Sequence, residues 1–431
     1  MNSLVTPVGE FELDRATGNA RDGLRAWDAA DEYLLRHLAE TGLLGPLAGS
    51  AAGSGADSAT ESVPDSPADS VTGANAGSSA GSPAGSVAGS SAGSVTGSVT
   101  GSVAVFGDRW GAIATALAAY APVQISDSFL AQRATRLNLE RNGVSGPRLL
   151  STLDDPPGRI DVLLVRVPKS LALLEDQLRR LAPSVHAGTV IVGAGMVTEI
   201  HTSTLQLFER VLGPTRTSLA VRKARLIFCT PDPAIPRAPS PWPRTYRLPE
   251  DAGPVSGRPV TNHAGVFCAD RLDIGTRFLL RHLPARGGQV VDLGCGNGVV
   301  GLAAALAHPE AELTFVDESY HAVASAEATF RAATDAPARF LVSDGMSEIP
   351  ARSVDLVLNN PPFHSHRAIG DATAWEMFTG SRRALRPGGE LYVVGNRHLG
   401  YHVKLRRLFG NCELVASDPK FVVLRAVKRE G

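Results

Sequence analysis

Short apolar runs alternate, through most of the chain, with segments in which apolar side chains recur every three or four positions. The runs are clearest at 103–106, 160–165, 289–293 and 354–358. An unbroken apolar run of this length is typical of a strand buried on both faces, and the three-and-four spacing is typical of an amphipathic helix. Their alternation predicts an α/β fold built on a parallel, doubly wound sheet.

This pattern occurs twice in the same order. Residues 103–118 align with 290–305 at a constant shift of 187 (294 − 107 and 298 − 111), which pairs Gly107 with Gly294 and Gly111 with Gly298. Later segments pair in the same order: 124–143 with 314–333, 159–170 with 353–364, 182–196 with 384–397, and 224–230 with 421–427. We therefore predict two tandem Rossmann-like domains, at 103–230 and 260–431.

Three other segments complete the predicted organisation. Residues 1–46 contain an amphipathic helix that we assign to the first domain and expect to be capped by Asn19 or Asp22; its apolar positions are Leu24, Trp27, Ala30, Tyr33, Leu34 and Leu38. Residues 47–102 are mainly Gly, Ser, Ala, Val and Thr, and predict a disordered, low-complexity insertion, because few large side chains offset the ordering entropy. Residues 231–259, rich in Pro and Arg, predict an irregular linker.

The composition excludes several classes of protein. Of 431 residues 43% are apolar, and 42 Lys and Arg against 43 Asp and Glu give a formal net charge of −1, so any contact with nucleic acid depends on local basic patches. The four cysteines form no CxxC pair, which argues against a zinc site and against a disulfide framework. There is no secretory signal and no apolar run of membrane-spanning length. We expect a cytoplasmic monomer that needs no metal and contacts no membrane.

The stretch 289–301, QVVDLGCGNGVVG, predicts a ligand site. A buried strand is followed by a glycine-rich turn that opens a helix, so that backbone N–H groups and the helix N-terminus face a ligand. Asp292, Gly294, Gly296 and Gly298 form the motif, and glycine permits both a positive φ and close approach of a ligand. A dinucleotide fingerprint would place its third glycine at 299, where Val299 stands, which weakens a nicotinamide interpretation. A tight structural turn is the alternative.

Two acids follow the next two predicted strands. Asp317 ends the run ELTFVD, and Asp344 follows RFLVS. Ligands of open α/β sheets bind outside the carboxyl ends of the strands, where these acids fall. Asp317 can accept both hydroxyls of a ribose, and Asp344 can meet an adenine amino group. Solvent-exposed loop acids are the alternative in both places.

The fourth strand of the second copy ends in Asn-Pro-Pro-Phe. Consecutive prolines stop the strand and fix the backbone, so Asn360 and Phe363 are held beside the pocket. The Asn360 amide oxygen and the Pro361 carbonyl can both accept hydrogen bonds from an exocyclic amine, while Phe363 can stack on the base. Two such acceptors favour the developing positive charge on an attacking aryl nitrogen. A simple strand-end turn is the alternative.

The first copy lacks this chemistry. Val105 stands where the second copy has Asp292, and Arg109 stands where it has Gly296. VRVPK at 165–169 replaces NNPPF at 359–363. The sequence therefore predicts that only the second domain keeps a functional pocket.

These motifs resemble those of the class I S-adenosylmethionine-dependent methyltransferases, and within them the ribosomal RNA guanine-N2 methyltransferases, most closely the large-subunit (23S) methyltransferase G type. The residues that carry the resemblance are 25–38, 262–283, 292–302 (DLGCGNGVVGL), 315–319, 359–364 (NNPPFH), 374–378, 396–412 and 420–428. The resemblance covers both halves and leaves out the Gly/Ser-rich insertion.

The resemblance implies a role for each motif residue. Asp292, Gly294, Gly296, Asp317 and Asp344 would hold S-adenosylmethionine, and Asn360, Pro361 and Phe363 would handle a guanine. Phe267, Gly275 and Thr276 would close over the cofactor. The first half would be a degenerate methyltransferase domain that recognises the substrate.

The implied partner is ribosomal RNA of the large subunit, whose target base must be unstacked or presented from a loop. Basic groups available for its backbone are Arg133, Arg136 and Arg141, then Arg222, Lys223 and Arg225, then Arg382, Arg383 and Arg386, and finally Arg397, His398, Lys404, Arg406 and Arg407. Solvated helix faces are the alternative for each group.

Other functions remain open from the sequence. The same chemistry would serve a guanine of 16S rRNA, an adenine amine or a protein glutamine amide. A non-enzymatic alternative is an assembly protein that binds rRNA and the cofactor without turnover.

Overall fold

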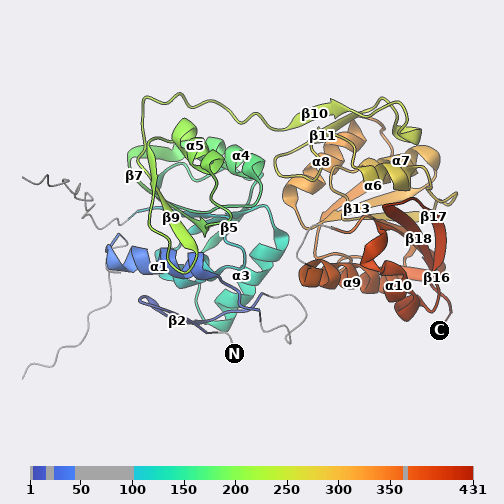
Figure 1. The fold of residues 1–431 in the computed structure, drawn as a ribbon, viewed down its shortest axis with the longest axis horizontal. Helices are drawn as coiled ribbons and strands as arrows, with labels where there is room; N and C mark the ends of the chain where they lie inside the picture. Colours follow the sequence, from blue (N-terminus) through green and yellow to red (C-terminus); the bar gives the residue numbers. More distant parts are fainter. Residues whose placement is uncertain (1–2, 16–23, 44–100, 363–366, 431) are drawn as a thin grey trace, which may run out of the picture.

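The computed structural model describes residues 3–15, 24–43, 101–362 and 367–430. Most of the predicted insertion, the predicted caps Asn19 and Asp22, and Phe363 lie outside these ranges. Figure 1 shows two α/β domains side by side, joined along one edge by the connector. Each domain contains one seven-stranded sheet.

The first domain has the sheet order β5-β4-β3-β6-β7-β9-β8. Its elements are β1 (Ser3–Thr6), β2 (Gly9–Glu12), α1 (Ala29–Glu40), β3 (Val103–Phe106), α2 (Ala112–Ala116), η1 (Ala118–Tyr120), β4 (Val123–Ser126), α3 (Phe129–Arg141), β5 (Arg148–Ser151), β6 (Ile160–Arg166), α4 (Leu171–Leu181), η2 (Ala182–Ser184), β7 (Val185–Met196), α5 (Thr202–Val211), β8 (Thr215–Thr217) and β9 (Ala224–Cys229).

The second domain repeats this order as β14-β13-β12-β15-β16-β18-β17. Its elements are α6 (Ile274–Leu280), β12 (Gln289–Leu293), α7 (Val299–Ala307), β13 (Glu312–Asp317), α8 (Tyr320–Arg331), β14 (Ala338–Val342), β15 (Val354–Asn359), α9 (Arg367–Ala384), β16 (Leu385–Asn396), η4 (Arg397–Leu399), α10 (Tyr401–Phe409), β17 (Glu413–Ser417) and β18 (Phe421–Val427).

The predicted parallel sheet is mixed at one edge in each domain. Five strands are parallel, whereas β9 and β18 run antiparallel to β7 and β16, and β8 and β17 pair antiparallel with them. The pattern missed β8 and β17 because β8 has only three residues and β17 is largely exposed, so neither forms a buried apolar run.

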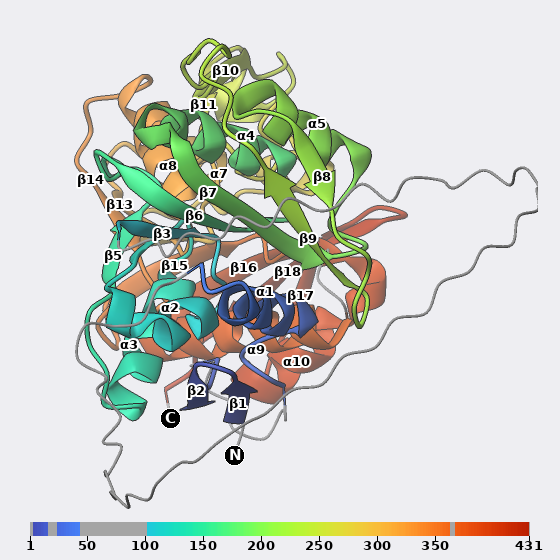
Figure 2. The same cartoon turned by 90° about the vertical axis from the view of Figure 1, so that its left-hand side faces the viewer.

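Helices cover both faces of each sheet, as a doubly wound fold requires. In the second domain, α6, α7 and α8 bury one face and α9 and α10 bury the other. In the first domain, α1 and α2 cover one face and α4 and α5 the opposite one. Figure 2 shows α1 lying against this first sheet. Within the described ranges, no helix is long and apolar enough to cross a membrane.

The predicted cap of α1 was wrong. The helix begins after Asp28, whose Oδ1 accepts a hydrogen bond from the Ala30 N–H at 2.8 Å. The Asp31 carboxylate accepts in return from the Asp28 N–H at 2.9 Å, which completes a capping box. Of the predicted apolar positions, Ala30, Leu34 and Leu38 lie on the buried face of α1, whereas Leu24 precedes the helix and is exposed.

The linker was predicted to be irregular, but part of it forms regular secondary structure. Its second part contains β10 (Arg244–Arg247) and η3 (Gly253–Val255), and β10 pairs antiparallel with β11 (Pro259–Asn262), which begins at the last residue of the predicted linker. This hairpin packs on α8, where the Thr261 N–H donates to the Thr329 hydroxyl at 3.0 Å. These strands escape pattern analysis because each has only four residues and β11 begins with proline.

Candidate active site

A cavity of about 860 Å³ opens at the carboxyl ends of the parallel strands of the second domain. Its wall includes the glycine turn after β12, the end of β13, the segment after β14 and the Asn360-Pro361-Pro362 corner after β15. The sequence-predicted motifs of the second half therefore meet in one cavity. Its volume lies within the range of small-molecule sites.

The glycine turn is fastened to the neighbouring strand by its backbone. The N–H groups of Gly294 and Cys295 donate to the Val316 carbonyl at 2.8 and 3.0 Å. Gly294 and Gly296 both line the cavity with positive φ angles, of +70° and +53°. A β-carbon on Gly296 would meet no atom within 4 Å, so this backbone is open to a ligand.

Gly298 has a different place. It starts α7 with φ +78° and does not line the cavity, because its Cα faces α8. A β-carbon there would lie 2.8 Å from the Ala326 Cα. Gly111 of the first copy has the same φ of +78° and also starts a helix, which agrees with the aligned repeat.

Asp292 is buried at the end of β12 and lines the cavity. Its Oδ2 accepts a hydrogen bond from the Gly301 N–H in α7 at 2.8 Å. Burial raises the pKa of Asp292 to about 8, and the nearby Asp317 carboxylate acts in the same direction. Asp292 thus joins the first strand to the helix that follows the glycine turn.

Replacing Asp292 by Asn should make stability less dependent on pH. A carboxyl group whose folded-state pKa is raised holds a proton that the unfolded chain loses, so wild-type stability falls as pH rises from about 4 to about 8. The amide carries no such proton, so the variant should gain stability relative to wild type at pH 8 but not at pH 5. Urea unfolding without ligand measures this difference.

Asp335→Asn, in an exposed loop, is the matched control and should leave the profile unchanged. If the free energy of unfolding of wild type and of Asp292→Asn changes with pH in the same way, the raised pKa assigned to Asp292 is wrong.

Asp317 organises the turn from the end of β13. One carboxylate oxygen accepts from the Gly296 N–H and the other from the Ser319 N–H, each at 3.0 Å. Each oxygen retains a second lone pair for a ligand hydroxyl. Burial raises the pKa of Asp317. Asp344 follows β14 and lines the same cavity, so both predicted acids lie where the strand-end rule placed them.

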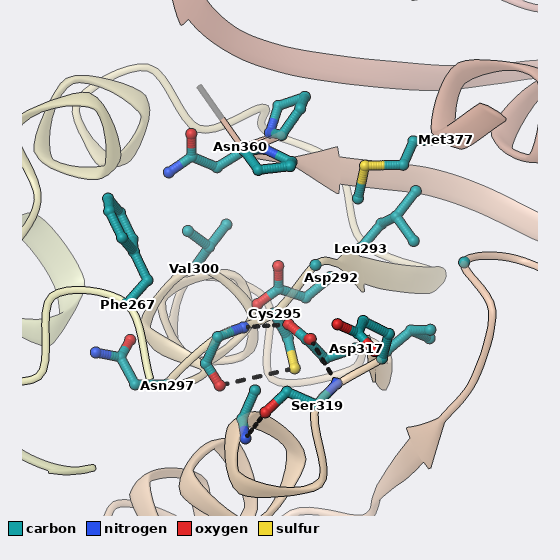
Figure 3. A pocket seen from close by; sticks show the side chains of 18 of the residues that line it. Phe267, Asp292, Leu293, Cys295, Asn297, Val300, Asp317, Ser319, Asn360 and Met377 are labelled. Atoms are coloured by element: carbon teal, nitrogen blue, oxygen red, sulfur yellow. Dashed lines mark hydrogen bonds between the residues drawn. The ribbon is translucent and has the colours of Figure 1, made fainter. Parts of the chain in front are cut away.

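Asn360 lines the cavity, and a neighbouring hydroxyl holds its amide. Its Nδ2 donates to the Thr276 hydroxyl at 3.0 Å, which fixes the orientation of the amide. Its Oδ1 is buried and has no hydrogen-bond partner among the described residues. The preceding Asn359 donates to the Leu293 carbonyl at 2.8 Å and so ties the end of β15 to β12. Figure 3 shows Asn360 across the cavity from Cys295 and Asn297 of the glycine turn.

The segment before β12 closes one side of the cavity. Phe267 and Thr276 line it, and the Phe267 ring lies near Asn360 in Figure 3. Gly275 does not line the cavity, and a β-carbon there would lie 3.1 Å from both the Phe421 ring and the Asp273 carboxylate, which is a tight contact. Pro361 is buried in the wall, and Phe363 lies outside the described residues.

Several lining residues were missed by sequence reasoning. Tyr246 reaches the cavity from β10, and its hydroxyl lies beside Asn297 without forming a well-oriented hydrogen bond. Met377 lines it from α9, and Leu130 and Arg133 line it from α3 of the first domain. Met377 could have been found from the sequence, because it lies on the helix that follows the Asn-Pro-Pro corner. The other three could not, because their positions depend on how the connector and the two domains pack together.

The corresponding region of the first domain is filled by its own side chains. Arg166, which aligns with Asn360, is fully buried. Its Nε donates to Asp31 at 2.6 Å and its Nη2 to Asp28 at 2.7 Å, both at the start of α1. Asp108 accepts three backbone N–H bonds at the start of α2, and burial raises its pKa to about 6. The first copy therefore keeps the turn but lacks the free amide acceptor found in the second.

Many of the predicted basic groups are engaged in ion pairs. Arg133 pairs with Asp344, Arg141 with Asp14, Arg222 with Glu32 and Arg386 with Asp355. Arg407 lies over the Trp375 ring at 5.5 Å. A pair at the surface still leaves donors for phosphate, so these contacts do not remove the groups as RNA ligands. They do tie Arg133 to the active site.

The comparisons agree with this arrangement. A family model described as a methyltransferase small domain matches residues 257–425, and one described as an RLMG N-terminal domain matches 1–49 and 92–233. The 16S rRNA N2 methyltransferase RsmC of T. thermophilus, solved with AdoMet and guanosine, has a TM-score of 0.65 at 25% identity and covers 76% of this chain and 88% of its own. The fold and site are therefore those of an S-adenosylmethionine-dependent methyltransferase.

Full-length relatives define the family more closely. The ribosomal RNA large subunit methyltransferase G of Streptomyces avermitilis is 64% identical over 430 residues, covering 99% of both chains. That of Pseudomonas syringae is 42% identical over 434 residues, covering 99% of this chain and all of its own. The chain belongs to the ribosomal RNA large subunit methyltransferase G family, which confirms the resemblance and the fold class expected from the sequence.

The residues of the cavity fit S-adenosylmethionine. The glycine turn offers open backbone at Gly296, Asp317 retains lone pairs toward the cavity wall, and the Asn360 Oδ1 is an unused acceptor. Among the described residues there is no group of three His, Cys, Asp or Glu side chains that could hold a metal ion.

Proposed function

We propose that the chain transfers a methyl group from S-adenosylmethionine to the N2 amine of one guanine in large-subunit ribosomal RNA. The observation that carries the proposal is the buried, unpaired Oδ1 of Asn360, held by Thr276 on the cavity that contains the glycine turn. The names of the relatives support ribosomal RNA of the large subunit, and the bound guanosine of the T. thermophilus enzyme supports guanine.

The residues of the second domain divide between the two ligands. Gly294, Gly296, Asp292, Asp317 and Asp344 hold the cofactor, with Asp317 at the ribose hydroxyls and Asp344 at the adenine amine. Phe267 and Thr276 close the cofactor end. When bound, the cofactor supplies an electrophilic methyl group on a sulfonium.

Asn360 acts on the amine. Its Oδ1 and the Pro361 carbonyl accept hydrogen bonds from the two N–H groups of the guanine amine and orient the nitrogen lone pair for in-line attack. These fixed acceptors would stabilise the positive charge that develops on the nitrogen as it takes up the methyl group. An amide oxygen is too weak a base to keep the proton, which passes to water.

The decisive experiment is nucleoside mass spectrometry with position mapping of rRNA from a strain that lacks the gene. Loss of a single N2-methylguanosine from large-subunit rRNA, restored by the wild-type gene and not by Asn360→Ala, is the expected result. Loss from 16S rRNA, or loss of a methyladenosine, would assign another nucleotide. If the strain that lacks the gene keeps every rRNA methylation but loses methylation of a glutamine in a protein, the substrate is the glutamine amide.

Replacing Gly296 by Ala should weaken cofactor binding about tenfold, because its methyl group would project into open space at the cavity wall. Gly410→Ala is the matched control. Gly410 also has a positive φ, of +74°, with nothing near the β-carbon position, but it ends α10 outside the cavity. Both variants place alanine at a positive φ, but only position 296 lines the cavity, so only Gly296→Ala should raise the Kd in isothermal titration with S-adenosylhomocysteine. Equal Kd values would remove Gly296 from the cofactor site.

A further inference from the structure

The two domains meet through matching loops that follow their second strands. Ser128 and Ser319 form an antiparallel bridge. The Phe129 N–H donates to the Glu318 carbonyl at 2.9 Å, and the Tyr320 N–H donates to the Asp127 carbonyl at 3.0 Å. Ser128 and Ser319 both cap the helix that follows, so the structure matches these two residues, one position away from the sequence pairing of 124–143 with 314–333. With this match each bond is the other with the domains exchanged, so the loops are related by a local two-fold axis.

The side chains of the loops repeat this exchange. The Ser128 hydroxyl donates to the Glu318 carboxylate at 2.6 Å, and the Ser319 hydroxyl donates to the Asp127 carboxylate at 2.6 Å. The Tyr320 hydroxyl donates to Gln132 at 2.9 Å. The loop that begins with Asp317 is therefore clamped by the first domain, and its position in the cofactor site depends on that clamp.

The helix that follows the first-domain loop extends this contact into the cavity. Leu130 and Arg133 of α3 line the cavity, and the Arg133 guanidinium forms an ion pair with Asp344. The side chains of Arg133 and Asp344 are 41% and 37% exposed, and ion pairs this exposed contribute little to stability. The pair contacts one carboxylate oxygen, Oδ2, and leaves Oδ1 for a second donor.

We propose that Arg133 is a positioning residue for the adenine end of the cofactor, acting from the degenerate domain through Asp344. Its guanidinium holds the Asp344 carboxylate in a fixed orientation through Oδ2, so that Oδ1 accepts from the exocyclic amine of adenine. The cofactor site is thus completed by both domains, although only the second keeps the glycine turn. This inference rests on the role of Asp344 in the proposed function.

The test is isothermal titration of the full chain with S-adenosylhomocysteine and with S-inosylhomocysteine, in which a carbonyl replaces the adenine amine. Wild type should prefer the adenine compound. Arg133→Gln should weaken its binding about fivefold to tenfold while changing that of the inosine compound little, so that discrimination falls. Arg133→Lys should restore most of it. Arg148→Gln, exposed at the start of β5 and outside the cavity, should bind like wild type.

Each other outcome has a definite meaning. Unchanged discrimination in Arg133→Gln, or an equal loss of affinity for both compounds, would overturn the inference, since a merely structural role weakens both. If wild type binds both compounds equally, the inference is overturned too, because Asp344 then does not recognise the adenine amine. Both outcomes leave the rRNA methylation measured by mass spectrometry untouched, whereas failure of wild type to bind either compound would sink the proposed function as well.

Discussion

Asn360→Ala should lower kcat by about 10²–10³ while the Kd for S-adenosylmethionine stays nearly unchanged. The Asn360 Oδ1 is an unpaired acceptor in a buried position, and Thr276 holds the amide before substrate arrives. An acceptor fixed in advance stabilises the charge that develops on the nitrogen, without the reorganisation that water would need. Single-turnover methylation of large-subunit rRNA, together with titration of the cofactor, measures the two effects separately.

Thr276→Val is the graded companion to this variant. It keeps the Asn360 acceptor but removes the hydroxyl that receives the Asn360 Nδ2, so the amide can rotate. We expect a smaller loss of kcat, about tenfold, from this loosened orientation. If Asn360→Ala keeps its turnover, the amide has no part in the chemistry.

Arg166→Ala should destabilise the first domain by about 3–5 kcal/mol, because it leaves the buried Asp31 carboxylate without its partner. Arg166 is fully buried, and its hydrogen bonds to Asp28 and Asp31 join the start of α1 to the end of β6. Burial already raises the pKa of Asp31, so loss of the guanidinium removes a charge that opposes this shift. Hydrogen exchange of the β3 and β6 amides reports the first domain separately from the second.

Arg159→Ala is the matched control for charge. Arg159 pairs with Asp161 at the surface, with its side chain 66% exposed, and its loss should change the free energy of unfolding by no more than about 1 kcal/mol. A similarly small change for Arg166→Ala would show that Asp28 and Asp31 are hydrated once the arginine is gone.

Local patterns predicted the parts of the site that lie within one strand and its following turn. The run at 289–293 with its glycines, the acid Asp317 and the corner at Asn360 all follow strands, and parallel strands bring such ends to one edge. The aligned repeat likewise predicted equivalent turns at Gly107 and Gly294, which have φ angles of +79° and +70°.

Contacts between distant segments could not be predicted in this way. Asp28 and Arg166 are 138 positions apart, and Arg133 and Asp344 are 211 apart, so no spacing rule links them. The start of α1 was misplaced because Asp28 looks like one more acid in a charged segment until Asp31 is seen to reciprocate its cap. Tyr246 was missed because the short strand that carries it has no apolar run.

The loops at 127–129 and 318–320 donate equivalent hydrogen bonds to each other, and this symmetry suggests how a chain with two similar domains could arise. A self-complementary loop lets one unit pair with a copy of itself, and fusion of the copies keeps the partner permanently at high effective concentration. After fusion one lobe can give up its ligand without losing the association. Arg166, buried in the first domain at the position that aligns with Asn360, therefore leaves the second domain undisturbed as long as the loop contact between the domains is kept.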